Sequence, residues 1–99
     1  MQKTLNSAPH QIFLSLLKQA RTAQGITQEM LCERIGMSQS DISKVERGVR
    51  RLDVLELRLW LRALDIPLDA FAKDLDARLT AAELLAEQAG GRRKSRAAR

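Results

Sequence analysis

The sequence has few of the residues that build strands, disulfides and metal sites. Its aromatic side chains are Phe13, Trp60 and Phe71, with no tyrosine. Burial must therefore come mainly from Leu, Ile, Val, Met and Ala, which favours packed helices over strands. The single cysteine, Cys32, cannot form an internal disulfide, and the one histidine has no Cys or His cluster around it to hold a metal. We expect an all-α fold with no structural metal and no cofactor.

Long hydrophobic runs are also missing. The first ten residues, MQKTLNSAPH, contain no apolar run long enough for a signal peptide, and no later segment is long and apolar enough to span a membrane. We therefore expect a soluble protein of the reducing cytoplasm. A chain of 99 residues can build one small domain around one continuous core.

The net charge of +5 is unevenly distributed along the chain. Residues 90–99, GGRRKSRAAR, hold five basic side chains and no acidic one, and we expect them to form a disordered basic tail. Residues 1–51 hold eight basic and four acidic side chains, whereas residues 52–89 hold four basic and eight acidic ones. The domain is therefore predicted to be basic in its first half and acidic in its second. Residues 1–10 are polar, and we expect a flexible arm there.

Hydrophobic spacing and capping residues predict the first three helices. The first covers residues 11–24 and ends at Gly25. The second follows Thr27 and ends at Gly36, and the third starts after Ser38. Because only about three residues separate the second and third helices, they must cross sharply, as in a helix-turn-helix motif.

Two further helices are predicted in the acidic half. A long apolar helix follows Asp53 and runs to about Leu64, with an inward face of Val54, Leu57, Trp60, Leu61 and Leu64. Pro67 then interrupts the chain, and a fifth helix begins near Leu68. Thr80 and Glu83 could start another helix or lie inside a continuous one, and the sequence leaves both open.

The third helix separates a thin core stripe from a polar face. At about 100° per residue, Ile42 and Val45 lie opposite a set of amide, hydroxyl and cationic side chains. That set is Gln39, Ser40, Ser43, Lys44 and Arg47. One interpretation is a face that is simply solvated, as most polar faces are. The other is a face that enters a DNA major groove, where glutamine pairs with adenine, lysine donates to guanine and serine bonds to the edge of either base.

A resemblance favours the second interpretation. The spacing of Gln28, Cys32, Gly36, Ile42 and Val45 resembles the helix-turn-helix of the lambda-repressor-like (Cro/XRE) family. The likeness continues in LKQARTAQGITQEML, VERG and ALDIPLDAF, and it covers about residues 11–72. It implies a five-helix lambda-repressor-like DNA-binding domain over residues 11–89, with the motif formed by the second and third helices.

The resemblance also implies roles for individual residues. The first part of the third helix would enter the major groove of double-stranded DNA, with base contacts from Gln39, Ser40, Ser43 and Lys44. Phosphate contacts would come from Thr27, Gln28, Arg47, Arg50 and Arg51. The family often pairs an acid at the position of Glu46 with an arginine of the first helix, here Arg21. We therefore predict a partly buried Arg21–Glu46 ion pair that orients the third helix, and the alternative is two independent surface charges.

The later helices hold more apolar side chains than a monomer needs. The expected interface comprises Leu55, Leu59, Phe71, Leu75 and Leu79. A two-fold dimer is the default for a protein that binds two half-sites. Asp65 stands where the family usually has a glycine after the fourth helix, so we expect that turn to be looser or differently capped.

These features predict a sequence-specific transcriptional regulator, a repressor that binds a palindromic operator as a homodimer. An alternative is the antitoxin of a toxin-antitoxin system, which would bind operator DNA and a toxin. A third possibility is non-specific nucleic-acid binding dominated by the basic tail. Enzymatic activity is not expected, because the sequence contains no phosphate-binding loop and no catalytic set of Ser, His and Asp.

Overall fold

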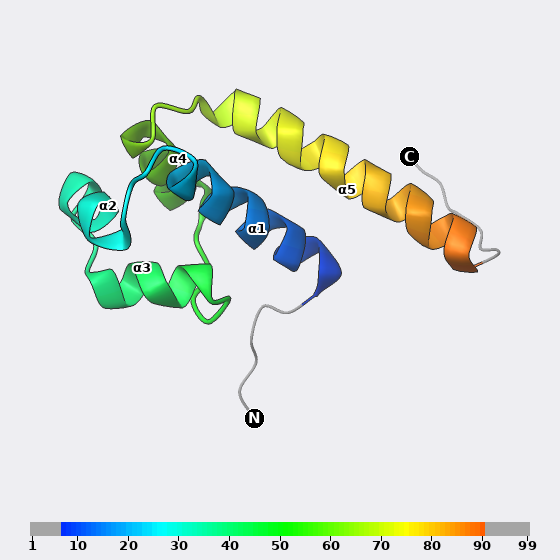
Figure 1. The fold of residues 1–99 in the computed structure, drawn as a ribbon, viewed down its shortest axis with the longest axis horizontal. Helices are drawn as coiled ribbons and strands as arrows, with labels where there is room; N and C mark the ends of the chain where they lie inside the picture. Colours follow the sequence, from blue (N-terminus) through cyan, green and yellow to red (C-terminus); the bar gives the residue numbers. More distant parts are fainter. Residues whose placement is uncertain (1–6, 91–99) are drawn as a thin grey trace.

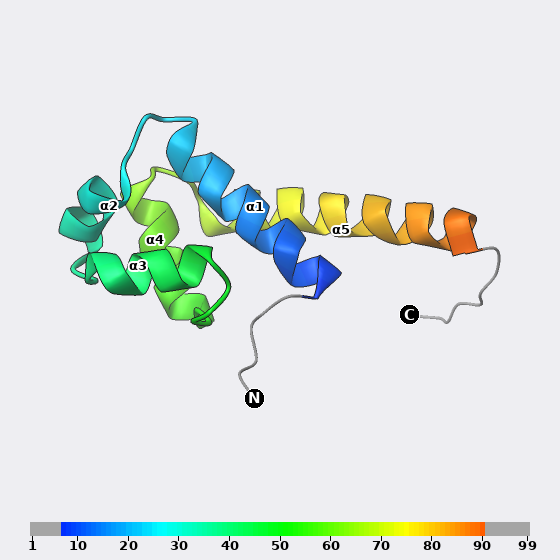
Figure 2. The ribbon, with the colours of Figure 1, turned by 60° about the horizontal axis from the view of Figure 1, so that its bottom comes forward.

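The computed structural model describes residues 7–90, which form five α-helices and no strand (Figures 1 and 2). In chain order they are α1 (Ala8–Thr22), α2 (Gln28–Ile35), α3 (Gln39–Glu46), α4 (Val54–Ala63) and α5 (Leu68–Gly90). The predicted all-α class and the helix-turn-helix of α2 and α3 are thus confirmed. None of the helices in this range is long and apolar enough to cross a membrane.

The first helix begins earlier than predicted. The Ser7 hydroxyl accepts a hydrogen bond from the His10 amide at 3.2 Å, and Pro9 lies in the first turn, where its missing N–H costs nothing. Residues 8–10, which the sequence analysis placed in the arm, therefore belong to α1. Gly90, the first residue of the predicted tail 90–99, is the last residue of α5, and residues 1–6 and 91–99 lie outside the described residues.

Short polar side chains start the other helices as the sequence predicts. Thr27 caps α2 and Ser38 caps α3, each hydroxyl accepting an amide of the first turn at 3.0 Å. Gly36 ends α2 in the left-handed conformation at φ 76°, where a side chain would be strained. Asp53 and Glu56 form a reciprocal capping box at the start of α4. These local signals fix where the chain turns.

The turn after α4 keeps the left-handed conformation without a glycine. Asp65 has φ 60°, and its amide donates to the Arg62 carbonyl at 3.0 Å, while the Ile66 amide donates to the Leu61 carbonyl at 2.9 Å. Aspartate enters this region more readily than most residues, although glycine enters it at no steric cost. The substitution noted in the sequence therefore leaves the turn intact.

The core lies where α1, α2, α3 and α4 meet the first half of α5. The helix pairs that pack closely are α1 with α3 and α5, α2 with α3 and α4, and α4 with α5. Trp60 and Leu17 are fully buried at the centre. The rest of the buried cluster comprises Leu16, Ile26, Leu31, Ile42, Val45, Leu61, Leu64 and Phe71. The inward face predicted for α4 needs one correction, because Val54 at the start of the helix is 61% exposed.

The last helix is continuous past Thr80 and runs to Gly90. Its first half packs on the domain, whereas its second half projects beyond α1 and away from the core (Figures 1 and 2). Phe71, predicted at a dimer interface, is only 4% exposed and contacts Phe13 edge to face at 6.0 Å between ring centroids. It is a core residue, because α5 covers the end of α1 at this point.

Candidate nucleic-acid interface

The polar face of α3 is presented to solvent by two buried anchors. Ile42 and Val45 are 0% and 1% exposed and fix the helix against the core. Gln39, Ser40 and Lys44 are exposed on the other side, and Ser43 is half-buried. We call these four polar side chains, Gln39, Ser40, Ser43 and Lys44, the recognition face. A helix held this way can enter a groove without exposing its apolar stripe.

One residue of the recognition face contacts the end of its own helix. The Arg47 guanidinium donates from Nε to the Ser43 hydroxyl at 3.2 Å. Arg47 is exposed and caps α3, so its remaining N–H groups face solvent beside the recognition face. The hydroxyl of Ser43 accepts this bond and can still donate one of its own.

Glu46 lies at the back of α3 and joins three helices. Its carboxylate accepts from Arg21 Nε at 2.7 Å and Nη2 at 2.9 Å, the bidentate geometry of strong ion pairs. Arg21 Nη1 also donates to the Ile26 carbonyl at 2.7 Å. The predicted ion pair is therefore present and buried, and it fixes the orientation of α3 relative to α1.

The same carboxylate also holds Gln28, a contact that the sequence analysis missed. Gln28 Nε2 donates to Glu46 Oε1 at 3.0 Å, which ties the start of α2 to the end of α3. Glutamine has two amide hydrogens and a carbonyl oxygen, so groups remain for other partners. Glu46 therefore positions both the helix that holds the recognition face and the first side chain of α2.

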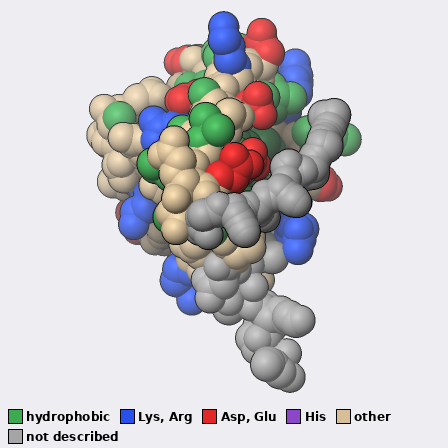
Figure 3. Space-filling model, turned by 90° about the vertical axis from the view of Figure 1, so that its right-hand side faces the viewer, with side chains coloured by type: hydrophobic (Ala, Val, Ile, Leu, Met, Phe, Trp, Pro, Cys, Tyr) green, Lys and Arg blue, Asp and Glu red, His purple; other side chains and the backbone are tan. Residues whose placement is uncertain are grey.

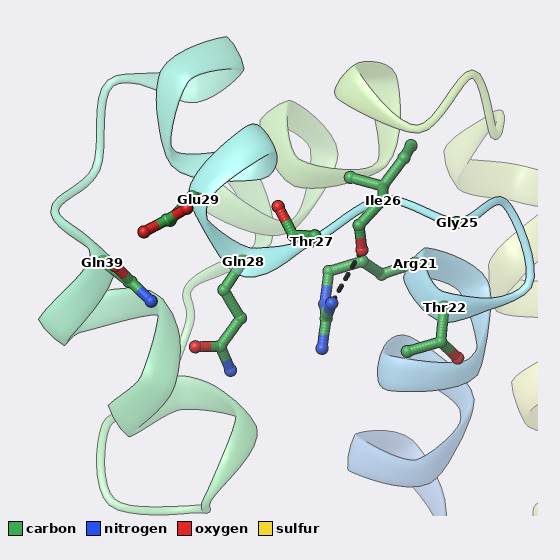
Figure 4. Close-up of a pocket in the computed structure, with 8 residues that line it drawn as sticks. All are labelled: Arg21, Thr22, Gly25, Ile26, Thr27, Gln28, Glu29 and Gln39. Atoms are coloured by element: carbon green, nitrogen blue, oxygen red, sulfur yellow. Dashed lines mark hydrogen bonds between the residues drawn. The ribbon is translucent and has the colours of Figure 1, made fainter.

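An open hollow of about 520 Å³ lies between the end of α1 and the starts of α2 and α3. Gln28 and Gln39 line it, and so do Arg21 and Ile26, which are joined by the hydrogen bond drawn in Figure 4. The first amides of a helix have no acceptor within the helix, and Thr27 satisfies that of Met30. The remaining amides at the start of α2 form a partly positive end that favours an anion, and the Glu29 carboxylate, which also lines the hollow, opposes it.

The two arginines after α3 differ in whether an acidic side chain of the domain pairs with them. Arg50 Nη2 pairs with Glu56 Oε2 at 2.9 Å, and this hydrogen bond raises the pKa of Arg50 and lowers that of Glu56. Arg50, which was predicted to contact phosphate, is thus already paired with Glu56 of the α4 capping box. Arg51 is exposed and forms no ion pair within residues 7–90. Arg51 is therefore the more available cation of this loop.

The structure divides the predicted interface set. Leu55 and Leu59 are exposed by 74% and 49%, and Leu75 and Leu79 are half-buried. Leu84 and Leu85, which were not predicted, are 54% and 66% exposed on the projecting part of α5. The sequence could have indicated this exposure, because on a helical wheel neither leucine lies on the line of Leu75 and Leu79 that packs against the domain.

Comparison with known proteins places these features in a family. A helix-turn-helix family model matches residues 17–71, which include all of α2, α3 and α4. An uncharacterized transcriptional regulator in the ATPase CF(0) region of Rhodospirillum rubrum is 42% identical over 60 residues. That match covers 61% of this chain and 56% of the relative, so the chain spans little more than half of that protein.

Solved structures show the same arrangement of helices. An XRE-family like protein from Pseudomonas syringae pv. tomato str. DC3000 has a TM-score of 0.68 and 42% identity, covering 72% of this chain and 87% of that one. The restriction-modification controller protein C.Esp1396I has a TM-score of 0.69 and 25% identity, and the match covers 77% of this chain and 99% of the controller. That controller is also known as a tetramer in complex with its natural 35 base-pair operator, with a TM-score of 0.66, 26% identity and coverage of 73% and 95%.

Proposed function

Because this chain belongs to the Cro/XRE-type helix-turn-helix family, we propose that it is a cytoplasmic, sequence-specific DNA-binding transcriptional regulator. It acts as a repressor that binds a palindromic operator as a dimer. The observation that supports this proposal most directly is the recognition face, held outward by Ile42 and Val45 and containing no carboxylate. Such a face suits the major groove, where carboxylates would meet the negative field of the phosphates.

Each side chain of the recognition face has a role in this proposal. Gln39 and Lys44 read base edges from the exposed side of α3, with glutamine suited to adenine and lysine to guanine. Ser40 and Ser43 make shorter-range contacts to either base edges or sugar. Arg47 donates to the DNA sugar-phosphate backbone beside these bases, while its Nε remains bonded to Ser43.

The hollow at the start of α2 is proposed to hold a DNA phosphate. Gln28 and the first amides of α2 donate to it, and Thr27 keeps the helix end formed. Because Glu46 holds Gln28, the phosphate site and the recognition face have a fixed spacing. Arg47 makes the second phosphate contact, Arg50 contributes only if it leaves Glu56, and Arg51 lies toward the starts of α1 and α4.

The proposed dimer buries exposed leucines of α4, namely Leu55 and Leu59, together with Leu75 and Leu79 of α5. Two copies related by a two-fold axis would place two recognition faces on successive turns of one DNA face. The operator-bound tetramer of C.Esp1396I supports an oligomer on DNA for this chain as well.

Selection of bound sequences from a random pool of double-stranded DNA tests the proposal. We expect a consensus of two inverted half-sites about one helical turn apart. A pool that yields no consensus, with binding lost after deletion of residues 90–99, would instead support non-specific binding by the tail. Recovery of a bound toxin with the protein would favour the antitoxin alternative.

A further inference from the structure

The second half of α5 has no place in the core of its own domain. Within residues 7–90, α5 packs only against α1 and α4, through a stripe that contains Phe71, Leu75 and Leu79. Residues 80–90 continue the helix for about 16 Å beyond this stripe. Leu85 is 66% exposed there, which leaves apolar area in water.

The projecting segment has a defined distribution of side chains. At about 100° per residue, Ala82, Ala86 and Ala89 continue the line of Leu75 and Leu79. On the same wheel, Leu85 borders one edge of this alanine line, Glu83 and Glu87 border the other, and Leu84 lies on the opposite side. The segment therefore offers a small apolar ridge with one acidic edge. Figure 3, which views this end of the molecule, shows acidic and hydrophobic side chains next to one another.

A groove of matching character lies beside the first half of the same helix. It has a volume of about 390 Å³ between the start of α1, the start of α4 and the middle of α5. Phe13, Leu57 and Leu75 line its apolar part, and His10 and Arg51 lie at its polar part. We call this hollow the α1/α4/α5 groove.

The polar part of the groove contains a cation and the N-terminal end of a helix. Arg51 is exposed, and the first turn of α1, which contributes Ser7 and Pro9 to the groove, contains no acidic residue. The N-terminal end of a helix has a partial positive charge. Asp53 is the only acidic side chain among the residues that line the groove. Its carboxylate accepts from the Glu56 amide at 2.8 Å, and the partial positive charge at the start of α4 partly offsets it.

We propose that the α1/α4/α5 groove binds the projecting end of α5, residues 80–90, from a second copy of this chain. A two-fold axis between two antiparallel α5 helices would place each projecting end beside the partner's Leu75 and Leu79, along the partner's groove. The alanine ridge fits a shallow groove because small side chains permit close approach. Glu83 and Glu87 then face Arg51 and the start of α1.

Charge also excludes the simplest alternative for this segment. Direct pairing of two projecting ends would bring Glu83 and Glu87 of both copies together, and like charges at such a contact are unfavourable. We call this reciprocal contact, in which residues 80–90 of each copy bind the α1/α4/α5 groove of the other, the exchange. It rests on the dimer of the proposed function and states which segment binds which surface in that dimer.

A matched pair of variants in the full chain tests the contact. Ala86→Arg places a long cation in the centre of the ridge, whereas Leu84→Arg adds the same charge on the opposite side of the same helix. Sedimentation equilibrium without DNA should show that Ala86→Arg weakens the dimer at least about tenfold and that Leu84→Arg changes it less than about twofold. The reverse order, or a wild-type chain that is still monomeric at about 100 μM, would overturn the exchange.

A charge exchange tests which groups meet. The Glu83→Arg/Glu87→Arg double variant and the single Arg51→Glu variant should each weaken the dimer, and their combination should recover most of the affinity. A combined variant that dimerises no better than the weaker parent would overturn the predicted pairing.

The DNA readout separates this inference from the proposed function. Ala86→Arg should select the same half-site from random DNA as the wild type and lose only the fixed spacing between two half-sites. A dimer that resists Ala86→Arg but dissociates with Leu55→Arg would refute the exchange and leave the regulator intact. Loss of the half-site consensus in the wild type would instead refute the regulator.

Discussion

Arg21 and Glu46 are 25 residues apart in sequence, yet they form a bidentate ion pair of 2.7 and 2.9 Å with side chains only 8% and 3% exposed. Removing two charges from water costs much of what their attraction gains, so the pair adds little net stability. Its value is geometric, because the guanidinium and the carboxylate admit few relative orientations. The pair therefore sets the angle at which α3 leaves the domain.

Removal of one partner should be costly. We expect Arg21→Met to lower the free energy of unfolding by about 3 kcal/mol, because it leaves the Glu46 carboxylate buried and without its cation. Urea denaturation followed by circular dichroism measures the change. The double variant Arg21→Met/Glu46→Leu should be less destabilised than Arg21→Met alone, since no buried charge remains. A double variant as unstable as the sum of both single changes would contradict this account.

Base contacts and phosphate contacts should differ in their dependence on sequence. Gln39→Ala and Lys44→Ala should each cost about 1–3 kcal/mol on the selected operator and relax the preference at particular base pairs. Arg47→Ala should weaken binding to operator and random DNA alike and reduce the slope of log K against log salt by about one. Titration of both DNAs at several salt concentrations measures these effects. An equal loss on both DNAs for Gln39→Ala would exclude a base contact.

Much of this fold follows from local sequence signals. Thr27, Ser38 and Asp53 start three helices because a short side-chain oxygen can accept a first-turn amide wherever the chain enters a helix. The burial of Ile42 and Val45 follows from helical period alone. These features depend on a few neighbouring residues, so the sequence is sufficient to predict them.

Features that depend on where two helices meet were harder to predict. A helical wheel puts Phe71 and Leu79 on one stripe, but only the position of α1 shows that Phe71 is covered while Leu79 is half-exposed. Likewise, spacing alone did not show that Glu46 holds Gln28 or that Glu56 holds Arg50. Each contact joins side chains whose relative placement is set by packing at a distance along the chain.

The Arg50–Glu56 pair should give the protein a specific response to acid. The pKa of Glu56 is lowered from its ordinary value of 4.5, because Arg50 and the Asp53 amide stabilise the charged form. The unfolded chain therefore binds more protons than the folded chain as the pH falls below 4.5, and this contribution to stability is lost in that range. Above that range the contribution is fully present.

The variant Glu56→Gln tests this response. An amide side chain at this position cannot titrate, so the free energy of unfolding of the variant should fall less steeply than that of the wild type between about pH 5 and pH 3. Urea unfolding at a series of pH values measures both slopes. Glu33→Gln, at an exposed position of α2, is a matched control that should keep the wild-type slope. Equal slopes for Glu56→Gln and the wild type would contradict the assigned shift.

The left-handed turn after α4 offers a change that should stabilise the protein. Asp65 adopts φ 60°, which strains most side chains, whereas glycine reaches this region without a steric penalty. Its exposed position means that little packing is lost on substitution. We expect Asp65→Gly to raise the free energy of unfolding by about 0.5–1 kcal/mol, which thermal unfolding would detect as a higher midpoint. Gly36→Ala provides the opposite test at φ 76°: apart from its chain neighbours and the backbone of its own helix, nothing lies within 4 Å of the added methyl, so its destabilisation would come from backbone strain. If Asp65→Gly lowered the midpoint, an interaction of the Asp65 carboxylate would have to outweigh the strain.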